Sequence, residues 1–164
     1  MKYLLVLIAF LPYSFNLSAQ KVKSDKTRVV FGLAGPELLH VGVTHRVADV
    51  SQLGLSVGVG PSKGMAWTSI NFEHRLYIGA HSERSNRKTW FFRQGTTFFP
   101  PETPPQKFTL TLTGGKDFLF KNPKNGITID AGVFYLPDSD RSSLNLIKSL
   151  NLWPALRFQL YTTL

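Results

Sequence analysis

Apolar and polar residues alternate with a period of two over most of this chain, and this alternation limits the folds open to it. In the clearest segment, residues 66–78, the even positions include Ile70 and Phe72, whereas the odd positions include Asn71 and Glu73. A period of two is the mark of a β-strand whose two faces meet different surroundings. Beyond the N-terminal segment no long stretch shows helical periodicity, so the sequence predicts an all-β protein.

Eight alternating segments are separated by turns rich in Gly, Pro, Asn and charged residues. They cover residues 28–34, 38–47, 53–59, 66–78, 89–99, 107–118, 126–135 and 154–163. Several approach the ~9–11 residues of a tilted membrane strand, and a closed antiparallel sheet leaves no unpaired edge in lipid. The connection over residues 79–88 is longer than a tight turn requires.

Alternation is compatible with two orientations of the faces. A soluble sandwich buries its apolar faces, whereas a membrane barrel turns them outward to lipid. The polar faces hold mainly Gly, Ser and Thr, and long charged side chains gather in connections such as residues 82–88 and 121–124. Because small polar side chains suit a narrow barrel interior, we expect an eight-stranded antiparallel up-and-down transmembrane β-barrel. The apolar side chains expected on its outside include Leu39, Ile70, Leu110 and Ile129.

The N-terminal segment is typical of a secretory signal peptide. Lys2 precedes a largely apolar run over residues 3–13, and small residues lead up to Ala19. The run is short for a membrane-spanning helix, which needs ~20 residues, although a retained anchor or a buried helix are the alternatives. We expect residues 1–19 to be a cleaved signal peptide, 20–27 a short linker and 28–164 the β-barrel domain.

Composition restricts the chemistry and the partners of the chain. Cysteine is absent, which excludes disulfides and thiol chemistry. The formal charge of +9 favours an anionic neighbour, such as lipopolysaccharide or an acidic polysaccharide, or basic loops at an anionic membrane surface. No nucleic-acid-binding motif is present, and an exported protein rarely meets nucleic acid, so that partner is not expected.

Aromatic residues gather near the ends of the alternating segments. They include Tyr77, residues 90–92, residues 98–99, Phe118, Phe120, residues 134–135 and Trp153. Aromatic residues at both ends of membrane strands form the girdles at the two interfaces of a barrel, so this placement predicts such girdles.

Several strands carry a family resemblance. Four segments resemble the strands of small outer-membrane β-barrel proteins of Gram-negative bacteria, of the eight-stranded OmpA/OmpX type. They are residues 71–77, 91–95 and 126–132 and a final strand over 154–161, which ends close to the chain terminus. The final strand resembles the signal read by the barrel-assembly machinery, although such signals usually finish on an aromatic residue and this chain ends on Leu164. The resemblance implies a location in the cell outer membrane.

The same resemblance implies an orientation and a set of partners. The termini would face the periplasm, and outer-membrane lipid, lipopolysaccharide and the assembly machinery would be partners. The connections that would face outward lie at residues 35–36, 60–64, 100–106 and 136–153. Within the last of these, residues 142–152 are expected to form a short amphipathic helix or a disordered loop. The proline-rich residues 98–105 could present a stiff contact surface or simply a rigid loop.

The sequence offers little catalytic chemistry. The four histidines are His40, His45, His74 and His81. None has a second potential metal ligand at a standard spacing in the sequence. His81 has the residue types of acyl transfer beside it, namely Ser82, Glu83 and Ser85, but in a polar turn and at an unsuitable spacing. We therefore expect no catalytic, cofactor-binding or metal-binding residues and no cofactor.

Charged residues on the polar faces are expected to fill the lumen. They are Arg46, Glu73, Arg75, Arg93, Asp117, Asp130 and Arg157. They would form either a path for ions or a salt-bridged plug, and an eight-stranded barrel is wide enough only for side chains, which favours the plug. Because buried charges must pair, we expect Glu73 and Asp130 each to contact an arginine.

The sequence thus predicts a non-enzymatic outer-membrane barrel with a structural or surface-interaction role through its loops, and it names no specific protein partner. One alternative is a soluble exported barrel with an apolar ligand inside, which requires inward apolar faces. The other is a lipid A-modifying enzyme, which a Ser–His pair within hydrogen-bonding distance on the outer wall would favour.

Overall fold

A computed structural model gives the fold of the chain. It describes residues 27–35, 37–61, 66–83, 87–100, 108–136 and 151–164. The expected signal peptide, almost all of the linker, and the expected helix or loop over 142–150 lie outside these residues, as does most of the proline-rich connection. No helix in the described part of the chain is long and apolar enough to cross a membrane.

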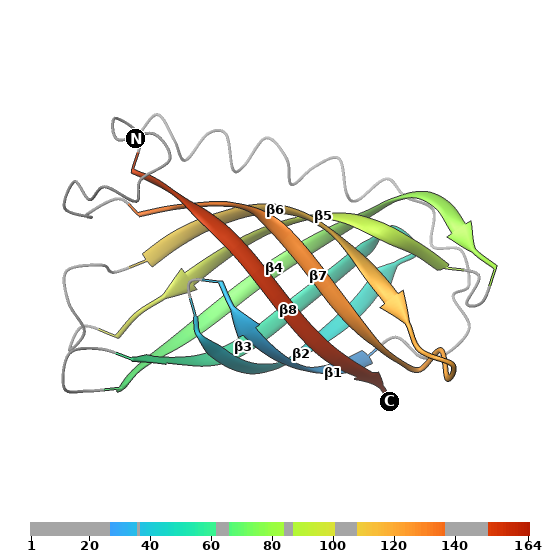
Figure 1. The fold of residues 1–164 in the computed structure, drawn as a ribbon, viewed down its shortest axis with the longest axis horizontal. Coiled ribbons are helices and arrows are strands. Elements are labelled where there is room, and N and C mark those ends of the chain that lie inside the picture. Colours follow the sequence, from blue (N-terminus) through green and yellow to red (C-terminus); the bar gives the residue numbers. More distant parts are fainter. Residues whose placement is uncertain (1–26, 36, 62–65, 84–86, 101–107, 137–150) are drawn as a thin grey trace.

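The described residues form one closed antiparallel barrel in which each strand pairs with the next and β1 pairs with β8 (Figure 1). The strands are β1 (Thr27–Ala34), β2 (Leu39–Ala48), β3 (Ser51–Pro61), β4 (Ala66–Ser82), β5 (Arg87–Phe98), β6 (Phe108–Leu119), β7 (Asn125–Tyr135) and β8 (Leu152–Thr163). The predicted all-β class, strand count and up-and-down order are confirmed. Both ends of the barrel domain, Thr27 and Thr163, lie at the same end of the barrel, which we call the terminal end.

One boundary prediction was wrong, because the connection expected over residues 79–88 is mostly strand. β4 continues to Ser82 and β5 already begins at Arg87. A register shift between Ile78 and His81 marks a bulge, and Gly79 adopts a φ of 79° there. The bulge inserts an extra residue and bends the strand, so alternation breaks at this point although pairing goes on. β8 likewise starts at Leu152, two residues before the predicted start.

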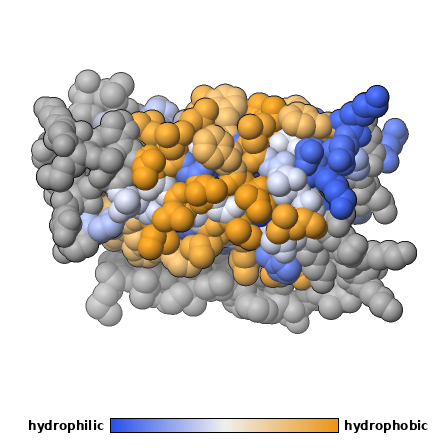
Figure 2. Space-filling model, turned by 90° about the horizontal axis from the view of Figure 1, so that it is seen from below, coloured by the Kyte–Doolittle hydropathy of each residue, from blue (hydrophilic) through white to orange (hydrophobic). Residues whose placement is uncertain are grey.

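The barrel has a polar inside and an apolar outside. Arg75, Arg93 and Arg157 are each 1% exposed, whereas Val57 and Phe72 are 54% and 53% exposed. Figure 2 shows apolar side chains covering the middle of the wall and hydrophilic ones gathered at the terminal end. The expected outward orientation of the apolar faces is therefore confirmed, and the alternative of inward apolar faces is wrong.

The expected aromatic girdles need a correction. Trp90, Phe92 and Phe98 lie on the outside, but Tyr77 and Phe91 are only 1% and 2% exposed and point into the barrel. Their rings contact each other, with centroids 5.5 Å apart. Position near a strand end was not sufficient to place them, because the parity of the position decides which side of the wall a side chain takes.

Candidate functional site

The central interior holds a cluster of three arginines and two carboxylates, which we call the central ion cluster: Glu73, Arg75, Arg93, Asp130 and Arg157. Arg75 Nε donates to Glu73 Oε1 at 2.8 Å, and Arg157 Nη1 donates to Glu73 Oε2. Arg157 Nε donates to Asp130 Oδ2 at 2.9 Å, and Arg93 Nη2 lies 3.1 Å from Asp130 Oδ1. All five were predicted for the lumen, and each carboxylate does contact an arginine.

Burial makes the ion pairs of the central ion cluster important for the stability of the fold. The side chains of Glu73 and Asp130 are 4% and 0% exposed, so neither carboxylate has water as an alternative partner. In such surroundings, removing one partner of an ion pair leaves an uncompensated charge and costs about 3–5 kcal/mol. The arginines also rank among the largest fully buried side chains. The cluster therefore fills the lumen as well as neutralising it.

A second cluster lies closer to the terminal end, around Asp117. Arg28 Nη1 donates to Asp117 Oδ2 at 2.7 Å, and the Thr128 hydroxyl donates to Oδ1 at 2.7 Å. The Tyr77 hydroxyl lies 3.0 Å from Asp117 Oδ2 and 2.7 Å from Gln52 Oε1. Asp117 was predicted for the lumen, but its main partners were not. We call this group the Asp117 cluster.

Arg46 is also buried, as predicted, but it joins neither cluster through a carboxylate. Its Nη1 donates to the carbonyl oxygen of Asp49 at 3.4 Å, and its guanidinium stacks 4.3 Å from the centre of the Tyr77 ring. A cation over an aromatic face is stabilised by the ring quadrupole. Arg46 therefore closes the terminal end of the lumen by stacking.

Glu37 closes the other end of the lumen. It lies in the β1–β2 connection and is only 1% exposed. The Thr97 hydroxyl donates to Glu37 Oε1 at 3.0 Å, and the side chain packs on Gly58, where a Cβ would approach it to 2.6 Å. Burial raises the pKa of the Glu37 carboxyl, an effect that Arg157 and Arg93 only partly offset.

Sequence reasoning missed Arg28, Glu37 and Gln52, and alternation could have found only some of them. Arg28 occupies an inward position within the predicted strand over residues 28–34, so parity alone could have identified it. Gln52 follows from parity only once its strand is extended from Leu53 back to Ser51. Glu37 lies in a connection, where no periodicity applies. Its inward position depends on how the β1–β2 connection turns back over the barrel mouth.

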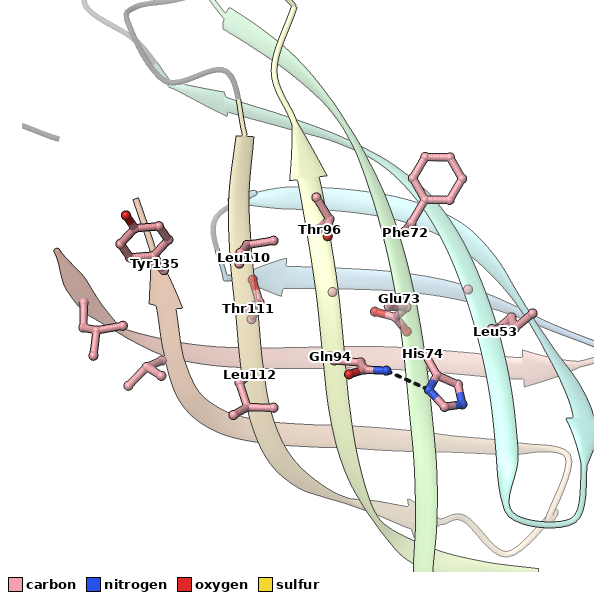
Figure 3. Close-up of a pocket in the computed structure, with 14 residues that line it drawn as sticks. Leu53, Phe72, Glu73, His74, Gln94, Thr96, Leu110, Thr111, Leu112 and Tyr135 are labelled. Carbon is pink, nitrogen blue, oxygen red and sulfur yellow. Dashed lines mark hydrogen bonds between the residues drawn. The ribbon is translucent and has the colours of Figure 1, made fainter. Parts of the chain in front are cut away.

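The outer wall carries a chain of polar side chains that the sequence analysis did not assemble, here called the outer-wall polar chain: Ser51, His74 and Gln94. Ser51 Oγ lies 2.9 Å from His74 Nε2. His74 Nδ1 lies 3.1 Å from Gln94 Nε2, a contact that Figure 3 shows as a dashed line. Leu53 and Phe72 flank this chain, and both line a pocket on the wall together with His74 and Gln94. His74 was expected to face outward, and it does.

The position of the proton on the His74 ring decides what chemistry the outer-wall polar chain can support. With the Gln94 amide nitrogen facing Nδ1, the ring proton resides on Nε2, and His74 donates to Ser51. A general base needs the opposite arrangement, with Nε2 accepting the serine proton. Ser51 is also only 3% exposed. In this arrangement the outer-wall polar chain is a hydrogen-bonded polar strip on an otherwise apolar wall, without a general base for Ser51.

The remaining histidines serve structural contacts. His40 lies inside the barrel, 2.8 Å from Gln159 Nε2. His45 meets the Thr27 hydroxyl at 2.9 Å, and exposed His81 lies 3.3 Å from Asp49 Oδ2. Within the described ranges, no three His, Cys, Asp or Glu side chains are grouped to hold a metal ion.

Comparison of the chain with protein-family models, with curated proteins and with solved structures finds no match. The function is therefore inferred from the geometry of the barrel itself.

Proposed function

We propose that this protein is an integral barrel of the bacterial outer membrane with a closed lumen, acting as a structural or surface-interaction protein rather than as a channel or an enzyme. One observation carries the proposal: the wall is apolar on the outside and encloses buried ion pairs. A protein in water places these two kinds of surface the other way round.

The size of the apolar surface supports a lipid environment. Exposed large hydrophobic side chains occur on every strand except β7, including Phe31, Val41, Leu55, Phe118 and Leu160. Soluble monomers rarely expose contiguous apolar patches of more than a few hundred Å². A closed barrel satisfies its backbone hydrogen bonds internally, which lipid requires.

The packed lumen argues against conduction. The central ion cluster occupies the middle of the barrel, Glu37 lies over one end and Arg46 over the other. Eight strands enclose a space just wide enough for such side chains. We therefore propose that the protein acts through its outer surface. Outer-membrane lipid and lipopolysaccharide would be its neighbours there, and the barrel-assembly machinery its partner during insertion.

A charge on the outer wall tests the membrane location directly. Val57 lies on β3 with its side chain 54% exposed. In a membrane barrel Val57→Arg would lower the free energy of unfolding by about 2–4 kcal/mol, whereas on a water-exposed wall the change would stay within about 0.5 kcal/mol. The proposal also requires heat-modifiable migration of the protein in the outer-membrane fraction. Recovery of the protein from the soluble periplasm would overturn it.

The Ser51–His74 pair favours a second candidate, a hydrolase of lipid acyl esters. Ser51 Oγ would attack the ester carbonyl carbon and lose its proton to His74 Nε2, which would protonate the departing alcohol; water would then release the fatty acid. This requires the Gln94 amide to be turned over so that its oxygen accepts from Nδ1. Labelling of the protein by a fluorophosphonate probe, lost in Ser51→Ala, with fatty-acid release from lipopolysaccharide would support this candidate; no labelling would reject it.

A further inference from the structure

Gln94 leaves part of its amide unused on the outer wall. Its Nε2 lies 3.1 Å from His74 Nδ1, and the side chain is exposed. A primary amide has two N–H donors and an acceptor oxygen. Among the residues that the structure describes, this amide makes no second hydrogen bond. One donor and one acceptor therefore face outward.

This free amide lies at the middle level of the wall. Gln94 follows Arg93 in β5 and His74 follows Glu73 in β4, so both are directly outside the central ion cluster. His74 and Gln94 are also register partners. If the barrel spans a membrane, as proposed above, this level is within the hydrocarbon, where no water can satisfy the amide.

We propose that a second copy of this chain covers this part of the wall, with the β4–β5 faces of two barrels in contact and their Gln94 amides paired. The argument is one of complementarity, because a carboxamide offers one donor and one acceptor side by side and is completed by another carboxamide in reversed order. A two-fold axis along the membrane normal produces that reversal and keeps both barrels inserted in the same direction.

The surroundings of Gln94 agree with such a contact. Phe92 lies two positions before Gln94 on the same face of β5, and Phe72 lies diagonally across from Gln94 on β4. Their side chains are 55% and 53% exposed and would pack against the partner barrel. Acyl chains of lipids lack a hydrogen-bond donor or acceptor, so they cover the phenyl rings but leave the amide unpaired. Polar contacts between membrane segments contribute about 0.6–2 kcal/mol each, which is enough to select this face.

Single cysteines can test the interface, since the natural chain has none. Thr96 lies two positions after Gln94 on the same outward face, and Phe158 lies on β8, on the far side of the closed barrel. Thr96→Cys and Phe158→Cys proteins, folded in phospholipid vesicles, would be treated with a short bifunctional maleimide. We expect a covalent dimer for Thr96→Cys, at least fivefold more than for Phe158→Cys.

The amide itself is tested by adding Gln94→Leu to the Thr96→Cys protein, which should reduce cross-linking to the level of Phe158→Cys. Equal cross-linking of both cysteines, no cross-linking of Thr96→Cys, or retention of the dimer after Gln94→Leu would each overturn the proposal. Heat-modifiable migration of the same samples separates the two ideas. A folded barrel that does not cross-link refutes only the dimer, whereas failure to insert into the vesicles refutes the membrane barrel.

Discussion

Asp130 on β7 and Arg157 on β8 are paired twice, once as direct partners in the backbone register and once as an ion pair with a distance of 2.9 Å between Oδ2 and Nε. The side-chain pair is fully buried, so strand pairing and charge pairing depend on each other at this point. A one-residue slip of β8 would turn Arg157 outward and leave Asp130 without this partner. The ion pair therefore specifies the register as well as filling the lumen.

Asp130→Asn should lower the free energy of unfolding by about 3–5 kcal/mol, because it leaves Arg75, Arg93 and Arg157 to share the single carboxylate of Glu73. Urea unfolding in lipid vesicles, followed by tryptophan fluorescence, measures the change. Asp49→Asn is the matched control, since Asp49 pairs with His81 near the surface and exposed pairs contribute little. Similar effects of the two substitutions would show that burial does not govern the energy of these pairs.

The pair Arg28–Asp117 predicts a different outcome for single and double substitutions. Asp117→Asn alone should destabilise the barrel by about 3–5 kcal/mol, because Arg28 stays buried without a counter-charge. Replacing both residues, as Arg28→Met with Asp117→Leu, should recover part of that loss, because the apolar side chains need no counter-charge, while the buried Thr128 hydroxyl loses its acceptor. A double variant less stable than Asp117→Asn would contradict this account.

Glu37 makes the stability depend on pH in the opposite direction to the paired carboxylates. Burial raises the pKa of Glu37 in the folded state, so the folded protein binds this proton more tightly than the unfolded chain does. The stabilisation is complete below the ordinary pKa of glutamate, ~4.3, and is lost as the pH rises through the raised value. Glu37→Gln should therefore be more stable than the natural protein at neutral pH.

Comparison of the two proteins over a pH series isolates this carboxyl, because the other lumen groups are common to both. The difference in the urea midpoint between Glu37→Gln and the natural protein should shrink as the pH falls. A difference that is constant with pH would show that Glu37 does not change its protonation between the folded and unfolded states.

Glycines on adjacent strands should respond differently to a methyl group. A Cβ at Gly132 would overlap the carbonyl oxygen of Leu112 and lie 2.7 Å from the Thr113 Cα, and neither backbone atom can move without opening the β6–β7 pairing. A Cβ at Gly114 would meet nothing closer than Phe92 at 3.9 Å. Gly132→Ala should therefore destabilise or prevent folding, whereas Gly114→Ala should be neutral or stabilising by up to ~1 kcal/mol. Refolding yield and urea midpoints measure both.

Prediction of the structure from the sequence fails mainly at the ends of strands and at the bulge in β4. Alternation placed Glu73, Arg93 and Asp130 inside, because a strand with one polar face needs no partner to show its period. It did not reveal the bulge at Gly79, because a bulge breaks the period and resembles a turn. It also placed Tyr77 with the girdle aromatics, because aromatic content at a strand end says nothing of which way the ring points.

By itself, the sequence determined the all-β class and the eight strands, because the period of two is a local property of each strand. It also determined the orientation of the faces, because the polar faces hold mainly Gly, Ser and Thr, which suit a narrow barrel interior. Only the closed tertiary structure decided which charges pair, since Glu73 and Arg157 come from β4 and β8 and meet across the lumen. The same holds for Glu37 over the barrel mouth and for the polar chain from Ser51 to Gln94. Register and closure bring these groups together, and both arise from contacts between residues far apart in the chain.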